Sequence, residues 1–296
     1  MAADRVGEGR GLTRGSGRRV AMVLAAGAAV VVLAGCGAAG SGAPSQYGRQ
    51  QLRRALRAWS GFAVSTSPRP LVLVGSQVAD PASGFPSSAV KLAYFGRAVT
   101  APPVLPPGPP AASGYPLISA GEAFTVFKST AGKGPPSAAV LKISTVRLGA
   151  GVFQTDRGPR RLPAWLFRFP GVRGAAAVLA VSPARIFSPP GPPAAVPPFV
   201  TGARLGPDGR TLTVEFTGAS SGTGPCAADY RLELAQSREA IAVAVREHDH
   251  STHVACSAVG YPRHVTTVLS APLGARVIVD AASRTAVATS EPAQAS

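Results

Sequence analysis

The sequence contains no asparagine, and this absence excludes several catalytic arrangements. A Cys-His-Asn site needs the asparagine amide, and the pattern of penicillin-binding proteins and β-lactamases needs Ser-Asp-Asn as well as Lys-Thr-Gly. Neither of these tripeptides is present, although Ser88 and Lys91 match the Ser-x-x-Lys part of the pattern. We therefore interpret residues 87–95 as an ordinary amphipathic helix.

Lysine is scarce as well, since only four of the 30 basic residues are lysine. With 14 acidic residues the formal net charge is +16. A charge of this sign favours nucleic acid or an anionic membrane surface as a partner. However, arginine that accompanies abundant alanine, glycine and proline is what GC-rich coding produces, so the charge alone does not identify a partner.

The chain also lacks an apolar run of membrane-spanning length near its start. Residues 20–33, VAMVLAAGAAVVVL, are apolar but fall short of the roughly 20 residues that a span needs. Residues 1–19 carry five arginines, and a basic segment before a short apolar one is typical of a secretory signal peptide. We predict that residues 1–35 are such a peptide. An uncleaved helix that continues through the small residues 37–40 is the alternative.

The apolar run ends in Leu-Ala-Gly-Cys at 33–36, which resembles the lipobox of bacterial lipoproteins. That resemblance implies a diacylglyceryl group on Cys36, which becomes the first residue of the mature chain. Two acyl chains anchor a protein stably, whereas one chain is marginal. We therefore expect the protein on the outer face of the cytoplasmic membrane, where export excludes nucleic acid as a partner. Arg18 and Arg19 leave Sec and twin-arginine export both open.

Only three cysteines are present, and lipidation of Cys36 leaves Cys226 and Cys256 as a pair. Outside the cell two remaining thiols are best interpreted as a disulfide, here closing a loop of about 30 residues. A metal site or two free thiols are the alternatives.

Composition and periodicity divide the mature chain into five segments. We predict the lipidated cysteine and a flexible tether at 36–48, an N-terminal α+β region at 49–183, a proline-rich connector at 184–198, a C-terminal β region with the disulfide at 199–284 and a disordered tail at 285–296. Whether the two regions form one domain or two is open.

The expected fold class is mostly β (α+β), an antiparallel sandwich or meander with a few short helices and proline-rich connectors. Residues 49–59 have apolar side chains at helical spacing, and residues 119–128 begin with a capping-box pattern. Residues 155–161, TDRGPRR, predict the turn of a long hairpin. From 199 to 282, short alternating stretches at intervals of 8–12 residues predict strands of an antiparallel sheet.

Several segments together resemble a group of uncharacterised lipoproteins from actinobacteria. The lipobox, PRPLVLVG, RGPRRLPAWLF and the C-terminal GPCAADY, ACSAVGY and APLGARVIVD segments carry the resemblance. It implies export, lipid anchoring and the pairing of Cys226 with Cys256. It implies no activity.

The stretch HDHSTH is the strongest chemical pattern in the chain, because it places His248, Asp249, His250 and His253 within six residues. Imidazole is a common metal ligand, so a divalent metal site is one interpretation. A polar turn whose side chains are all in water is the other. The Gly-x-Ser-x-Gly match at 218–222 precedes Gly-Pro-Cys rather than a helix, so we interpret it as a small-residue loop and not as a nucleophile elbow.

These observations predict a lipid-anchored, extracytoplasmic protein with a non-catalytic role in binding or scaffolding within the cell envelope. Its partners are the membrane, through Cys36, and a cell-wall polymer or an envelope protein; the oligomeric state is open. The alternatives are an envelope enzyme that acts on wall polymer through a pair of carboxylates, and a metal-binding lipoprotein that uses the HDHSTH stretch.

Overall fold

The computed structural model describes residues 46–81, 84–109, 111–112, 114–132, 139–191, 199–250 and 254–290. The predicted signal peptide, Cys36 and most of the tether lie outside these residues. The structure is mostly β, with 41% of the described residues in strands and 15% in helices, which confirms the predicted fold class. Its helices are α1 (Gln46–Ala58), α2 (Ser88–Phe95) and α3 (Ala120–Ser129), with a 3-10 turn at Pro183–Arg185.

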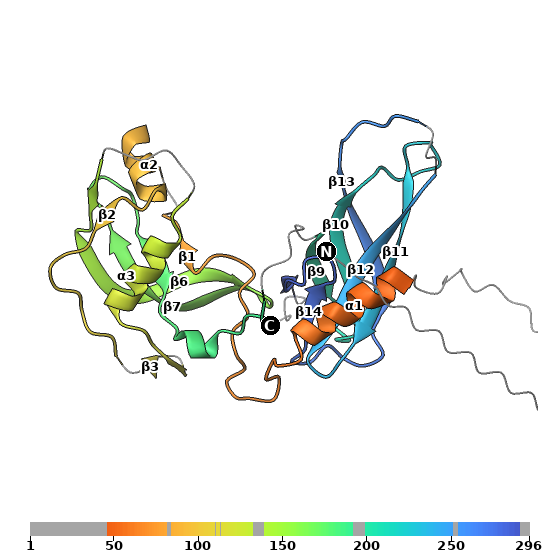
Figure 1. Ribbon diagram of the computed structural model, residues 1–296, viewed down its shortest axis with the longest axis horizontal. Helices are drawn as coiled ribbons and strands as arrows, with labels where there is room; N and C mark the ends of the chain where they lie inside the picture. The colour runs from red at the N-terminus through yellow and green to blue at the C-terminus, as the bar shows by residue number, and fades with distance from the viewer. Residues whose placement is uncertain are drawn as a thin grey trace, which may run out of the picture. The chain divides into compact units, whose positions relative to one another are not determined.

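The first sheet is antiparallel and has the order β1-β8-β7-β6 (Figure 1). Its strands are β1 (Val78–Ala79), β8 (Ala176–Leu179), β7 (Gly158–Arg168) and β6 (Thr145–Thr155). Two short pairs accompany it, namely β2 (Val99–Thr100) with β5 (Leu141–Lys142) and β3 (Ala111–Ala112) with β4 (Tyr115–Pro116). Trp165 and Phe167 of β7 are buried with Phe127 of α3 in one apolar cluster, so α3 covers this face of the sheet.

Helix α3 begins where the capping-box pattern predicts. The Ser119 side chain accepts a hydrogen bond from the backbone N–H of Glu122, and the Glu122 side chain accepts one from the backbone N–H of Ser119. Because both backbone donors would otherwise lack a partner at the helix start, this local pattern determines the boundary.

The β6–β7 hairpin is confirmed, but its turn is shorter than predicted. Thr155 pairs with Gly158, so only Asp156 and Arg157 form the turn, and residues 159–161 already belong to β7. Gly158 has a φ of +76°, a left-handed backbone conformation that favours glycine and allows this tight turn.

The C-terminal part of the structure contains two more sheets, of order β13-β10-β9-β15 and β11-β12-β14. Their strands are β9 (Val200–Leu205), β10 (Thr211–Gly218), β11 (Ala228–Gln236), β12 (Ala240–Asp249), β13 (Tyr261–Val268), β14 (Val277–Asp280) and β15 (Thr289–Ser290). Strand β12 has apolar side chains on both faces. Ile241 and Val243 pack with β9 and β10, whereas Ala240 and Ala242 pack with α1. Successive side chains of a strand point to opposite faces, so the sheet that contains β12 is the middle layer between α1 and the sheet that contains β9 and β10 (Figure 1).

Two strand pairs in these sheets are parallel, namely β12 with β14 and β9 with β15. The second pair corrects the predicted tail at 285–296, because Thr289 and Ser290 are in a strand and Val287 is buried in the core. Burial of Val287 accounts for this order, since an apolar side chain in the core holds its segment in place. Residues 291–296 lie outside the described residues.

The start of the proline-rich connector packs on the protein through Ile186 and Phe187, which are both half-buried. Ile186 pairs with Leu71 in an isolated parallel β-bridge. The ring centroid of Phe187 lies 5.2 Å from that of Trp59 and 5.2 Å from that of Phe62. Residues 192–198 of the connector lie outside the described residues.

The turn between β9 and β10 contains Pro207, Asp208 and Gly209, and the pKa of the Asp208 carboxylate is shifted. Asp208 accepts hydrogen bonds from the backbone N–H groups of Thr211 and Arg210, and these bonds lower its pKa from 3.8 to about 2. Because the pKa of Asp208 is lower in the folded state than in the unfolded state, its ionised form stabilises the fold. This stabilisation is fully present above pH 3.8 and is lost as the pH falls through about 2. We therefore expect wild type to exceed Asp208→Asn in urea midpoint at pH 5 and the two to converge near pH 2. A difference that stays constant over this range would contradict the assignment.

Candidate functional site

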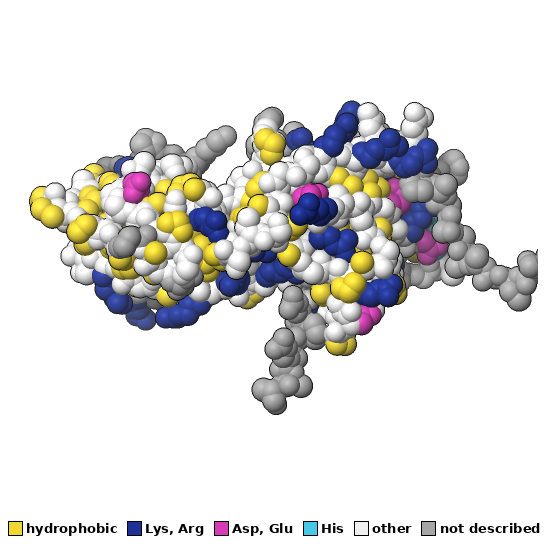
Figure 2. All heavy atoms as spheres, turned by 90° about the horizontal axis from the view of Figure 1, so that it is seen from below, with side chains coloured by type: hydrophobic (Ala, Val, Ile, Leu, Met, Phe, Trp, Pro, Cys, Tyr) yellow, Lys and Arg dark blue, Asp and Glu magenta, His cyan; other side chains and the backbone are white. Residues whose placement is uncertain are grey.

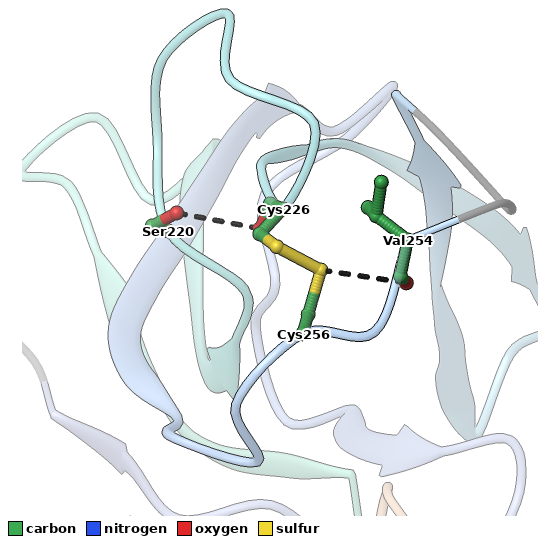
Figure 3. The surroundings of a disulfide bond; sticks show 4 residues. All are labelled: Ser220, Cys226, Val254 and Cys256. Carbon is green, nitrogen blue, oxygen red and sulfur yellow. Dashed lines mark hydrogen bonds between the residues drawn. A yellow bond between two sulfur atoms is a disulfide. The ribbon is translucent and has the colours of Figure 1, made fainter.

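Cys226 and Cys256 form a disulfide, with 2.04 Å between sulfurs and 5.6 Å between Cα atoms, which confirms the predicted pair. The bond joins the loop before β11 to the segment between β12 and β13 (Figure 3). Both cysteines are exposed. The Ser220 hydroxyl donates a hydrogen bond to the Cys226 carbonyl, which supports the same loop from its other side (Figure 3). The disulfide therefore restrains two surface segments at one end of the C-terminal sheets, which we call the disulfide end.

Backbone hydrogen bonds attach this loop to the adjacent strands. The N–H of Ala228 donates to the carbonyl of Ser220 at 3.3 Å, and the N–H of His250 donates to the carbonyl of Ala227 at 3.1 Å. The loop is therefore connected to the start of β11 and to the end of β12 independently of the disulfide.

Tyr230 of β11 is the centre of the polar contacts at the disulfide end. Its hydroxyl accepts a hydrogen bond from the N–H of Ala219 at 2.6 Å and donates a short one to the carboxylate of Glu247. The guanidinium of Arg263 lies 5.0 Å from the Tyr230 ring centroid, and the Phe216 ring lies 4.8 Å away, edge-on. Burial, and then the hydrogen bond to Glu247, raise the pKa of Tyr230 above its ordinary value.

Glycine is required at position 218 because Tyr230 approaches the backbone there. A Cβ at Gly218 would lie 2.5 Å from the Tyr230 hydroxyl oxygen and 2.7 Å from its Cζ. We expect Gly218→Ala to lower the free energy of unfolding by about 1–3 kcal/mol, because the ring must shift to make room. Gly224→Ala in the loop that follows β10 meets no atom within 4 Å and serves as the control, with an expected change within about 0.5 kcal/mol. Urea unfolding measures both, and equal effects would contradict the role of Tyr230.

Two hollows lie at the disulfide end, and Tyr230, which lines the first, contacts residues that line the second. The first has a volume of about 290 Å³ and is lined by three pairs that face each other across the hairpin, namely Asp229 with His248, Tyr230 with Glu247, and Arg231 with Arg246. The second, of about 420 Å³, is lined by Thr201, Arg204, Glu215, Phe216, Thr217, Pro262, Arg263 and His264. Phe216 and Arg263, which line the second hollow, both contact Tyr230, which lines the first.

The predicted metal ligands lie at the end of β12 and just beyond it. His248 is opposite Asp229 in the strand register, and the Nε2 of His250 is 3.0 Å from the Asp229 Oδ2. Asp249 points to the other face of the strand by alternation, and His253 lies outside the described residues. In the described part of the chain, no three histidine, cysteine or acidic side chains are placed to hold a metal. The metal site thus stays a prediction.

Sequence reasoning did not identify the contact between His250 and Asp229, or the contact between Tyr230 and Glu247. The partners are 21 and 17 residues apart, and only the register of the β11–β12 hairpin brings them together. Alternating hydrophobicity predicts both strands, but it does not specify which residues pair.

The chemistry at this end is that of a polar surface. The Gly-x-Ser-x-Gly segment is a loop, as expected, and its Ser220 hydroxyl is directed to a backbone carbonyl. Over the described ranges, no serine, threonine or cysteine side chain is hydrogen-bonded to a histidine or lysine side chain, the contact that activates a nucleophile. A ligand at this surface would contact carboxylate, imidazole and guanidinium groups around Tyr230.

No family model, curated protein sequence or solved structure matches this chain. The resemblance to actinobacterial lipoproteins therefore stays a prediction. Of the helices that the structure describes, none combines the length and the apolar character needed to cross a membrane.

Proposed function

We propose that this protein is a lipid-anchored, extracytoplasmic protein with a non-catalytic role in binding or scaffolding within the cell envelope. The lipobox at 33–36 supports the anchor, and the disulfide supports an oxidising compartment outside the cytoplasm. The ligand we favour is a cell-wall polymer, whose sugar and acidic groups suit the polar side chains of the disulfide end.

The observation that carries this proposal is the restraint of the loops at the disulfide end, where the strands that line the two hollows begin or end. Cys226–Cys256 joins the two loops covalently, and the backbone hydrogen bonds of Ala227 and Ala228 attach the first loop to the adjacent strands. A surface that is already ordered before binding loses little conformational entropy when a ligand arrives. Glu247 and His248 are exposed there, where a ligand can reach them.

The anchor is tested by replacing Cys36 with alanine in the producing cell. We expect wild type in the membrane fraction, released only by detergent, and the variant uncleaved or shed into the medium because its sulfur cannot accept the lipid. Mass spectrometry of the purified wild type should show the mass of residues 36–296 plus a diacylglyceryl group. A Cys36→Ala protein that is processed and anchored as before would contradict the proposal.

Binding is tested by thermal unfolding of the oxidised mature chain in the presence of purified cell-wall fragments. A ligand that binds only the folded state raises Tm, by about 2.7 kcal/mol of stability at one hundred times its Kd. We expect a rise that is reduced in Glu247→Ala/His248→Ala and retained in Lys91→Ala, which changes a distant charge on α2. A rise that both variants retain would contradict a site at the disulfide end. Turnover of the fragments would identify an enzyme instead.

A further inference from the structure

We propose that the exposed face of α1 binds anionic phospholipid headgroups and thereby orients the anchored protein on its membrane. This inference rests on the proposed lipid anchor at Cys36. It adds to it a second, electrostatic contact between the folded protein and the bilayer.

The arginines of α1 are opposite its buried face. At about 100° per residue, Arg53, Arg54 and Arg57 fall within one arc of about 100°. All three are exposed, whereas Leu52 and Trp59 on the other side are 2% and 1% exposed. The helix therefore presents a compact group of guanidinium groups to solvent.

Among the described residues, no acidic side chain forms an ion pair with this group of arginines. Helix α1 contains no aspartate or glutamate, and within the described ranges Arg53, Arg54 and Arg57 form no ion pair. The buried carboxylate on the adjacent strand, Glu233, already accepts hydrogen bonds from Arg246 at 2.9 Å and from Arg231 at 3.4 Å. The positive charge of the face is thus available to an external anion.

The packing of α1 limits how it can meet a bilayer. Leu52, Ala55 and Trp59 lie in a core cluster with β12 and β14, and the indole N–H of Trp59 donates to the Arg284 carbonyl at 2.9 Å. The apolar side chains are therefore not free to insert between lipids, as those of a monotopic amphipathic helix do. Contact through the arginines remains, and it should weaken with added salt.

The position of α1 in the chain brings this face to the membrane. Gln46 is ten positions after Cys36, so the helix starts at most about 35 Å along the chain from the proposed lipid anchor. A flexible Gly/Ser-rich chain of that length has a root-mean-square span of only about 18 Å. The short distance between the proposed anchor and α1, together with the complementary charge, favours the anionic headgroups of the same membrane as the ligand of the arginine face.

The experiment must distinguish a specific contact through α1 from a general attraction caused by the protein's net positive charge. On the face shown in Figure 2, Lys and Arg side chains are visibly more numerous than Asp and Glu, so other surfaces also attract anions. Arg147, Arg160 and Arg161 on the β6–β7 hairpin are exposed and form no ion pair within the described residues. Replacing these three by glutamine removes the same charge elsewhere and is the matched control.

The experiment uses the mature chain with Cys36→Ser, which contains every described residue, and sedimentation with lipid vesicles. We expect binding to phosphatidylglycerol vesicles and none to phosphatidylcholine vesicles. The partition coefficient should fall about 100-fold in Arg53→Gln/Arg54→Gln/Arg57→Gln, because each basic residue near the surface contributes roughly fivefold. The same replacements by lysine should preserve binding, and 0.5 M salt should abolish it.

Equal losses in the α1 variant and the hairpin control, or no binding to phosphatidylglycerol, would overturn the inference. Footprinting of wild type with an arginine-specific dicarbonyl reagent keeps the test valid if a variant does not fold, since vesicles should protect Arg53 and Arg57 but not Arg160. Failure here with Cys36-dependent anchoring intact overturns only this inference, because the unlipidated chain tests the contact separately from the anchor.

Discussion

Replacing Asp156 with alanine is expected to lower the free energy of unfolding by about 3–5 kcal/mol, the usual cost of removing one partner from a buried ion pair. The Asp156 side chain is 3% exposed at the tip of the β6–β7 hairpin. It accepts two hydrogen bonds from the Arg69 guanidinium, one of them 3.2 Å long from Nη1, and its Oδ2 lies 3.7 Å from the Nε of Arg157. Its loss leaves two arginines without their counter-ion.

The effect should be large because both arginines also hold a segment distant in sequence. Arg69 donates to the carbonyl of Ala275 at 2.9 Å, and Arg157 donates to those of Gly274 at 2.6 Å and Arg276 at 2.9 Å. Asp156 fixes the orientation of both guanidinium groups, so its removal weakens these bonds as well. Networks of this kind lose more than a single pair does.

The control is Glu215→Ala, which breaks the ion pair with Arg204. Those side chains are 37% and 59% exposed, and an exposed pair contributes at most about 1 kcal/mol. Urea unfolding followed by circular dichroism and by tryptophan fluorescence measures both variants. If Asp156→Ala costs no more than Glu215→Ala, the proposed role of the network is wrong.

Replacing Cys226 and Cys256 together by serine is expected to cost about 3–4 kcal/mol, the chain-entropy value for a loop of this size. The cysteines are 30 residues apart, and the loop that they close contains the whole β11–β12 hairpin. Without the bond the unfolded chain gains freedom, and the loops around the two hollows lose their covalent restraint.

Calorimetry of wild type, the double variant and wild type with a reductant measures this prediction. Because both cysteines are exposed, the reductant should lower the Tm of wild type to that of the double variant. The reductant should leave the double variant unchanged, which is its internal control. A Tm shift that corresponds to less than about 1 kcal/mol would show that other contacts hold this end.

Local patterns in the sequence predicted several elements because their causes are local. Apolar residues at helical spacing, including Leu52 and Trp59, predicted α1 and its buried face. The pair Ser119 and Glu122 determined the start of α3. The cysteine count predicted the disulfide, because assigning Cys36 to the predicted lipid anchor leaves only Cys226 and Cys256 to pair.

The contacts that define the candidate site and the core depended on the tertiary structure. Alternation along β12 shows that its side chains have two faces, but not that alanines face α1 while Ile241 and Val243 face a second sheet. Strand β14 pairs in parallel with β12, and β15 pairs in parallel with β9, so both pairings join segments that are distant in sequence. The burial of Asp156 also depends on contacts with distant segments, and the contact between Tyr230 and Glu247 depends on strand register. By itself the sequence determined the mostly β class, the start of α3 at its capping box and the cysteine pair, because local patterns and composition suffice for each. Only the tertiary structure decided which strands pair and which polar groups meet, because those choices depend on packing the whole core at once.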